Sequence, residues 1–77
     1  MPNTKTYYLP VEGLAGISGY SILPIEAEDA YDAFAKRHTV LNNRSYKSVW
    51  FPQDKAPTPA YMEQLKQELR SRRGLYR

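Results

Sequence analysis

The feature that most constrains this sequence is an absence: its 77 residues include no cysteine and a single histidine, His38. Domains of this size bury little apolar surface, and many are supported by disulfides, a structural zinc ion or association with another chain. Disulfides require cysteine, and one histidine cannot complete a tetrahedral zinc site. The sequence therefore predicts a single domain spanning residues 1–77, without metal or cofactor, for which association with another protein or a second copy remains an available support.

The composition indicates a globular chain with an unusual core. The hydrophobic share is 42% and the charged share 25%, which lies in the globular range. Alanine and tyrosine contribute seven residues each, whereas isoleucine and valine contribute three each. Such a core buries less hydrocarbon than one built from leucine and isoleucine, and each buried tyrosine must satisfy its hydroxyl.

The sequence also bears on location. It contains no cysteine and no apolar stretch typical of a signal peptide, which favours a cytoplasmic protein. No apolar run approaches the roughly 18 residues that a membrane span requires. We therefore expect no membrane partner.

Residue periodicity and turn chemistry predict an α+β domain with the order β-β-α-β-α, in which an antiparallel sheet packs against one or two helices. The expected elements are strands at 4–11, 17–25 and 44–51, a helix at 26–38, a proline-rich loop at 52–58, a second helix that ends near Gly74, and a short tail at 74–77. Pro10 cannot donate a ladder hydrogen bond, so it predicts a sheet edge or the end of pairing there.

The helix expected at 26–38 has acidic residues in its first turn and basic residues in its last, as the helix dipole prefers. Its predicted apolar face consists of Ala27, Ala30, Tyr31, Phe34 and His38. The second helix is predicted to start with Thr58 as cap and Pro59 as its first residue. Its predicted apolar seam is Tyr61, Leu65 and Leu69, with Met62 beside it.

Nothing in the sequence forms a strong catalytic motif. His38 lies at the end of a predicted helix, where packing or the helix dipole accounts for it. Gly19 directly follows Ser18, so this segment is not a nucleophile elbow. The carboxylates of Glu28, Asp29 and Asp32 share one helical turn, which the dipole explains without a metal. We therefore expect no enzymatic activity.

Charge is distributed unevenly along the chain. Residues 1–35 hold one lysine against five carboxylates, a net −4, whereas residues 36–77 hold ten basic residues against three carboxylates, a net +7. Such asymmetry affects partners and encounter rates rather than the fold. Two segments concentrate basic and aromatic residues, the strand at 44–51 and the second helix with its tail. The candidate partner-binding residues are Arg44, Tyr46, Lys47, Trp50, Lys66, Arg70, Arg73, Tyr76 and Arg77.

These residues support two functional hypotheses. Tyr, Trp and Arg are enriched at protein–protein hot spots, which favours a regulatory or inhibitory module that binds a larger host protein or nucleoprotein assembly. Small cysteine-free chains of this type are common among phage and mobile-element proteins. The alternative is a nucleic-acid-binding protein that places its cations on phosphates and its aromatic rings on bases. The same residues also have an ordinary structural use, as a solvated helix end and as core aromatics.

Overall fold

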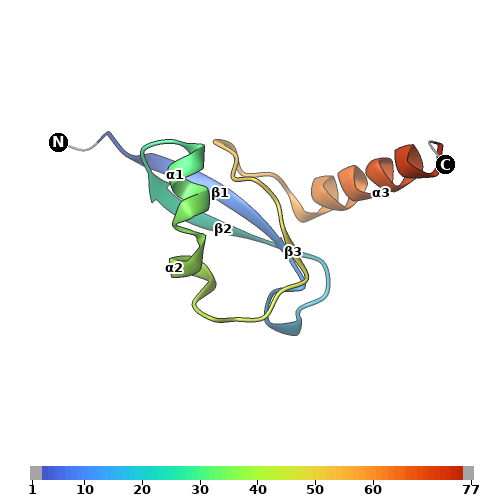
Figure 1. Ribbon diagram of the computed structural model, residues 1–77, viewed down its shortest axis with the longest axis horizontal. Coiled ribbons are helices and arrows are strands. Elements are labelled where there is room, and N and C mark those ends of the chain that lie inside the picture. Colours follow the sequence, from blue (N-terminus) through green and yellow to red (C-terminus); the bar gives the residue numbers. More distant parts are fainter. Residues whose placement is uncertain (1–2, 76–77) are drawn as a thin grey trace.

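The computed structural model describes the backbone of residues 3–75 and the side chains of residues 3–71. It has the predicted α+β architecture, with three antiparallel strands in the order β2-β1-β3 (Figure 1). The elements are β1 (Lys5–Glu12), the single turn η1 (Leu14–Gly16), β2 (Tyr20–Ala27), α1 (Ala30–Ala35), α2 (Arg37–Leu41), β3 (Ser48–Val49) and α3 (Pro59–Leu75).

A long hairpin of β1 and β2 forms the centre of the fold, with every residue from Lys5 to Glu12 paired to a residue of β2. The turn between them depends on Gly13, whose φ of 71° lies in the left-handed region. A Cβ at this glycine would lie 3.1 Å from the Cβ of Lys47, so a larger residue here would require the chain after α2 to move slightly away. Backbone hydrogen bonds from the amides of Lys47, Trp50 and Gln53 to β1 carbonyls hold residues 47–53 alongside this strand.

Pro10 lies in the central strand and pairs with Ile22, so the expected sheet edge is wrong, whereas the β1–β3 ladder does end beside it, at Val11. Its carbonyl accepts from the amide of Trp50 (2.9 Å), which places the backbone groups of Pro10 on the β3 side of β1. Because proline has no N–H, the β1–β3 ladder lacks one hydrogen bond at this position. The hydrogen bonds of the β1–β2 hairpin are unaffected.

This gap helps to explain why the strand expected at 44–51 is reduced to β3, the two residues Ser48 and Val49. Pairing resumes only as an isolated bridge between Tyr8 and Gln53. Pro52 also lacks an N–H, so the chain between the two pairings has few donors for a continuous ladder.

The outer edge of β2 is a second place where proline limits pairing. Because the even-numbered residues of β1 direct their backbone groups to β3, the antiparallel register directs those of Tyr20, Ile22, Pro24 and Glu26 away from the sheet. Pro24 has no N–H to offer at the middle of this edge. A proline in this position is a known means of discouraging edge-to-edge association.

The predicted start of the helix at 26–38 is wrong. Strand pairing continues to Ala27, which is buried opposite Lys5, and Glu26 accepts from the Thr6 hydroxyl. The helix begins only at Ala30, where the Asp29 side chain caps it by accepting from the amide of Asp32 (2.7 Å). Pairing with β1 therefore overrides the helical preference of residues 26–27.

The same helix is also broken at Lys36, which has non-helical dihedral angles and separates α1 from α2. The Arg37 guanidinium donates to the Phe34 carbonyl at this break (2.8 Å). His38 and Tyr31 are exposed, so the predicted apolar face is wrong for both residues. Asn42 and Asn43 adopt positive φ angles and end α2, as expected for asparagine at a helix C-terminus.

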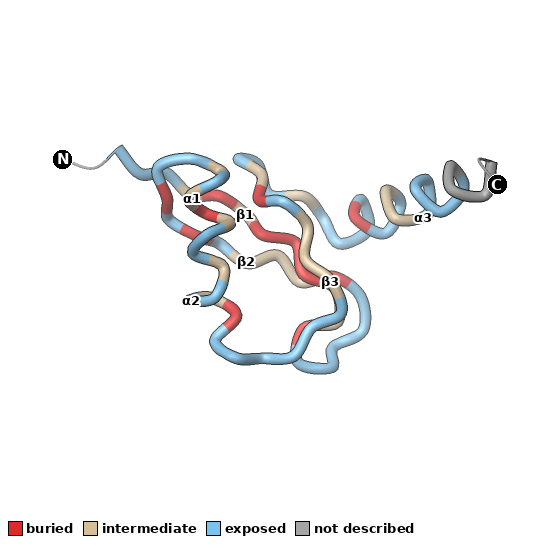
Figure 2. Tube along the Cα trace, viewed as in Figure 1, coloured by how far each residue is buried: buried red, intermediate tan, exposed pale blue. Residues whose placement is uncertain are grey.

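The main apolar core lies between the sheet and the two short helices. Odd-numbered residues of β1 face these helices, and Leu9 and Val11 are fully buried among them. Figure 2 shows this buried stretch along β1. The cluster contains Tyr7, Leu9, Val11, Leu14, Ile25, Ala27, Ala33 and Leu41. We call this side of the sheet the α1/α2 face, and the opposite side the α3 face.

Helix α3 begins as predicted, with the Thr58 hydroxyl accepting from the Tyr61 amide (3.1 Å). Met62 is fully buried, whereas Tyr61 and Leu69 are about half exposed, so the predicted seam is displaced toward Met62, Leu65 and Lys66. The helix continues through Gly74 to Leu75, the last residue whose backbone is described, which corrects the expected stop at Gly74. Of the tail expected at 74–77, residues 76–77 lie outside the described part of the chain.

The second half of α3 extends past the sheet (Figure 1). The molecule measures 49 × 24 × 21 Å, and its radius of gyration is 13.7 Å. A compact domain of this length would have a radius of gyration of about 11.5 Å. Among residues 3–75, no helix combines the length and apolar character needed to cross a bilayer.

Candidate functional site

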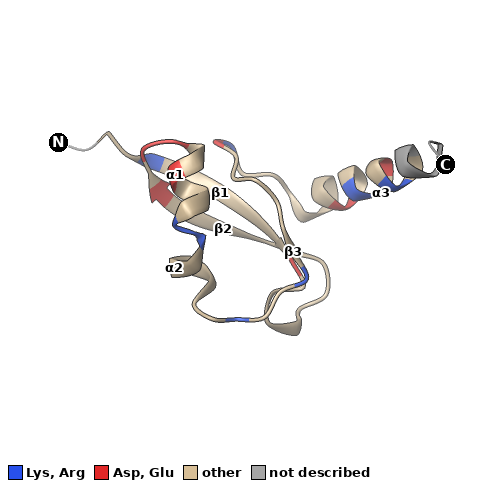
Figure 3. Cartoon of the chain, in the orientation of Figure 1, with Lys and Arg blue, Asp and Glu red and all other residues tan. Residues whose placement is uncertain are grey.

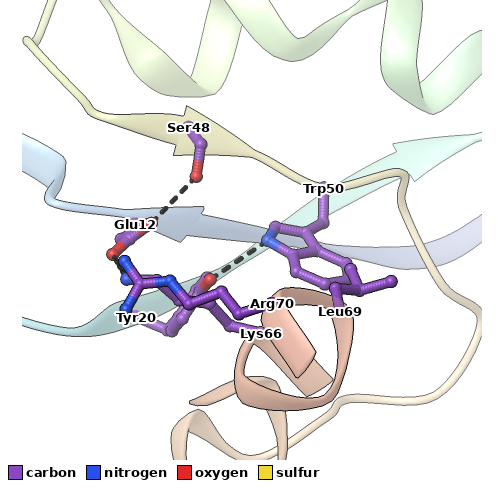
Figure 4. A pocket seen from close by; sticks show the side chains of 7 residues that line it. All are labelled: Glu12, Tyr20, Ser48, Trp50, Lys66, Leu69 and Arg70. Atoms are coloured by element: carbon purple, nitrogen blue, oxygen red, sulfur yellow. Dashed lines mark hydrogen bonds and ion pairs between the residues drawn. The ribbon is translucent and has the colours of Figure 1, made fainter. Parts of the chain in front are cut away.

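A cleft of about 330 Å³ opens where α3 crosses the sheet. It is lined from β1, β2, the β3 segment and α3 by seven residues: Glu12, Tyr20, Ser48, Trp50, Lys66, Leu69 and Arg70. Their side chains converge on one space in Figure 4. The sheet residues all belong to the α3 face, because strand alternation places Glu12 opposite both Tyr20 and Ser48.

Glu12 is at the centre of the polar side of the cleft. Its Oε2 accepts from Lys66 Nζ in an ion pair, and its Oε1 accepts from the Ser48 hydroxyl (3.1 Å). The hydrogen bond from Lys66 lowers the pKa of the Glu12 carboxyl, and the same bond raises the pKa of Lys66. Both carboxylate oxygens are therefore engaged, and the pair connects β1 to α3.

Trp50 and Tyr20 form the aromatic wall of the cleft. The Trp50 indole N–H donates to the Tyr20 hydroxyl (3.2 Å), and the two rings meet edge to face with centroids 6.4 Å apart. Tyr20 is buried and Trp50 is partly exposed. The tyrosine thus satisfies the one polar atom of the indole and leaves part of the ring open to the cleft.

Leu69 and Arg70 complete the cleft on the α3 side. Leu69 is 45% exposed although it faces the cleft, so its apolar surface is only partly covered. The positive charge of Arg70 is close enough to Lys66 to oppose the rise in the lysine pKa. Neither of the ion pairs found within residues 3–71 involves Arg70.

The structure brings three of the predicted site residues together, namely Trp50, Lys66 and Arg70. Arg44 lies elsewhere and caps α2, donating from Nε to the Leu41 carbonyl (3.0 Å) and from its terminal nitrogen to the Val40 carbonyl. Tyr46 and Lys47 are exposed and do not line the cleft. The predictions for the side chains of Arg73, Tyr76 and Arg77 lie outside the described residues.

Sequence reasoning missed Glu12, Tyr20 and Ser48 as lining residues. Glu12 and Lys66 are 54 residues apart in the sequence, and no local sequence pattern predicts an ion pair between residues so far apart. Tyr20 lies within the strand predicted at 17–25, and its neighbours in the sequence indicate no binding role. The one available signal was strand alternation, which places Ser48 and Trp50 on the same face.

A second exposed aromatic surface lies on the α1/α2 face. Tyr31, which is 76% exposed, meets the Phe51 ring with centroids 5.2 Å apart, and Phe51 meets Phe34 at 5.6 Å. The Arg37 guanidinium lies 4.1 Å from the centroid of the Phe34 ring. These residues form an aromatic cluster with edge-to-face and tilted ring contacts, on the opposite side of the sheet from the cleft.

A scan against protein-family models and searches of characterised proteins and of solved structures give no match to this chain. Within the described residues, no group of three or more His, Cys, Asp or Glu side chains is arranged to hold a metal ion. Charges of both signs occur along α3, and acidic residues cluster near the start of α1 (Figure 3).

Proposed function

We propose that this protein is a binding module that recognises another protein through the cleft between α3 and the sheet, and that it acts as a regulator or inhibitor of a larger assembly without catalysing a reaction. The observation that carries the proposal is the composition of the cleft. It presents a partly exposed Trp50 ring, a half-exposed Leu69 and the cation of Arg70 in one cleft. Trp and Arg are the residues that most often dominate protein–protein binding energy.

Binding accounts for the polar groups of the cleft better than catalysis does. The Ser48 hydroxyl donates to Glu12, whose pKa is lowered by Lys66, so the carboxylate is a weak base at neutral pH. His38, the one histidine of the sequence, lies outside the cleft. The Glu12–Lys66 pair is explained by holding α3 in place.

The contacts of the cations also favour a protein partner over a nucleic acid. A polyanion is bound by several cations that follow its backbone. Arg44 is held by carbonyls at the end of α2, and Lys66 is neutralised by Glu12.

The test is a nuclease-treated pull-down with quantitative mass spectrometry, run with three forms of the protein. The first is the wild type, and the second is the double variant Leu69→Gln/Arg70→Gln, which alters the cleft while keeping good helix-forming residues. The third is Tyr31→Ser, which removes the exposed aromatic residue on the opposite face. We expect at least one protein to be retained by the wild type and by Tyr31→Ser and to be lost from the double variant.

Two outcomes contradict the proposal. Retention that survives in the double variant and is lost in Tyr31→Ser would move the binding surface to the aromatic cluster. Retention that disappears on nuclease treatment, together with salt-sensitive binding of a short oligonucleotide, would favour nucleic-acid binding instead.

A further inference from the structure

The charges in the cleft do not balance, and this points to the chemistry of the occupant. Glu12 and Lys66 neutralise each other, and the second carboxylate oxygen is used by Ser48. Arg70 then contributes an additional positive charge, and no carboxylate within residues 3–71 lies at ion-pair distance from it. The cleft therefore carries a net charge of about +1 and complements a single anionic group.

The apolar part of the cleft lies directly beside this cation. Leu69 precedes Arg70 in α3, and Trp50 supplies the facing aromatic ring. The Trp50 N–H is already bonded to Tyr20, so the indole offers mainly its apolar ring surface to an occupant. A complementary segment needs an apolar side chain for this surface and an anionic group within a residue or two of it.

We infer that the occupant is an acidic segment of a partner protein, in which an apolar side chain enters between Trp50 and Leu69 and a neighbouring Asp or Glu carboxylate pairs with Arg70. This inference rests on the proposed function and specifies its ligand. The guanidinium has several donors in a plane and can bind a carboxylate through two parallel hydrogen bonds. Arg70 thus selects for the acidic residue, and the apolar contact anchors the segment.

A random peptide library displayed on phage tests the inference directly. Selections are run on the wild type, on Arg70→Gln and on Arg70→Glu, each with counter-selection on the double variant Leu69→Gln/Arg70→Gln. Peptides selected by the wild type should contain an acidic residue next to an apolar one. Arg70→Gln should select apolar peptides without acidic enrichment, and Arg70→Glu should favour Lys or Arg at that position.

The affinities of synthetic peptides taken from the selection test the inference quantitatively. The sequence has one tryptophan and seven tyrosines, so fluorescence excited selectively at the long-wavelength edge of the tryptophan band reports on Trp50. Replacing the acidic residue of the peptide by its amide should weaken binding to the wild type about tenfold, the value of a typical charge-assisted hydrogen bond. The same replacement should change binding to Arg70→Gln by less than about twofold, because the cation is absent.

The possible outcomes distinguish a failure of the acidic-segment inference from a failure of the proposed binding function. Wild-type peptides that lack acidic enrichment, or an amide replacement that leaves affinity unchanged, overturn the acidic-segment inference while peptide capture by the cleft stands. A selection on the wild type that enriches no peptide once binders of the double variant are removed overturns the proposed cleft as well. Preferential binding of inorganic phosphate over the peptide carboxylate would also contradict the inference.

Discussion

Replacing Met62 by alanine tests how α3 is attached to the sheet, on which the cleft depends. Met62 is fully buried, and it is the sole residue of α3 classed as buried among those whose side chains are described. It is not part of the main apolar cluster on the opposite face. Burial of a methionine side chain contributes about 1.5–3 kcal/mol, and substitution of buried methionine by alanine costs about 2–5 kcal/mol because a cavity remains.

We expect Met62→Ala to lower the free energy of unfolding by about 2–3 kcal/mol. The value lies at the lower end of the range because a helix packed on one face of a sheet can move into a cavity more readily than a central core can. A domain of 77 residues has a free energy of unfolding of about 4–11 kcal/mol. The substitution therefore removes a large fraction of the stability. Urea unfolding monitored by Trp50 fluorescence measures the loss, and with a slope of about 1 kcal/mol per molar the midpoint falls by about 2–3 M.

Two matched variants control this measurement. Tyr61→Ala alters the neighbouring residue, which is half exposed, and should cost less than about 1 kcal/mol. Met62→Leu keeps the volume and should cost less than about 1.5 kcal/mol. If Met62→Ala costs no more than Tyr61→Ala, then Met62 does not hold α3 on the sheet and the account of the cleft is wrong.

Three further predictions concern the sheet edge, the α1 cap and the ion pair. Pro24→Thr restores a donor on the outer edge of β2, so light scattering should show larger species than for the wild type as concentration rises. Asp29→Ala removes the α1 cap and should cost about 1 kcal/mol, seen as a lower midpoint of thermal unfolding. The ionised Glu12 stabilises the fold above its ordinary pKa of 4.5, and the loss follows as pH falls through the lowered folded pKa. Protonated Lys66 stabilises the fold below its ordinary pKa of 10.5, and this contribution is lost as pH rises through the raised folded pKa. The stability difference between wild type and Glu12→Gln should therefore shrink at both extremes.

Each of these predictions has a clear contrary result. A Pro24→Thr protein that stays monomeric would show that other features protect the edge. An Asp29→Ala protein as stable as an exposed control, Glu28→Ala, would show that the cap is not needed. A Glu12→Gln difference that is constant from acid to alkaline pH would remove the Glu12–Lys66 pair as a pH-dependent link.

The fold class followed from local signals that the structure also uses. Thr58 and Pro59 mark the start of α3, and two asparagines end α2, because capping and turn chemistry are properties of a few neighbouring residues. The hairpin followed from β-formers on either side of a glycine turn. Such signals survive in the folded state when tertiary contacts do not oppose them.

The errors arose where distant contacts decided the outcome. Residues 26–27 remain in β2 because they pair with β1, although they resemble a helix start. Pro10 lies in the central strand because its missing donor affects one ladder alone. The cleft could be predicted only in part, since strand alternation groups Ser48 with Trp50 but no sequence pattern places Glu12 beside Lys66.

The most direct test of the central claim is the NMR signal of the Trp50 indole N–H during titration with a protein retained in the pull-down. The sequence has one tryptophan, so this signal is unique, and it arises inside the cleft. We predict that the signal shifts or broadens in proportion to the bound fraction in the wild type, and that Leu69→Gln/Arg70→Gln reduces the effect. A partner that binds while the indole signal stays unchanged and the Tyr31 region responds would contradict the claim.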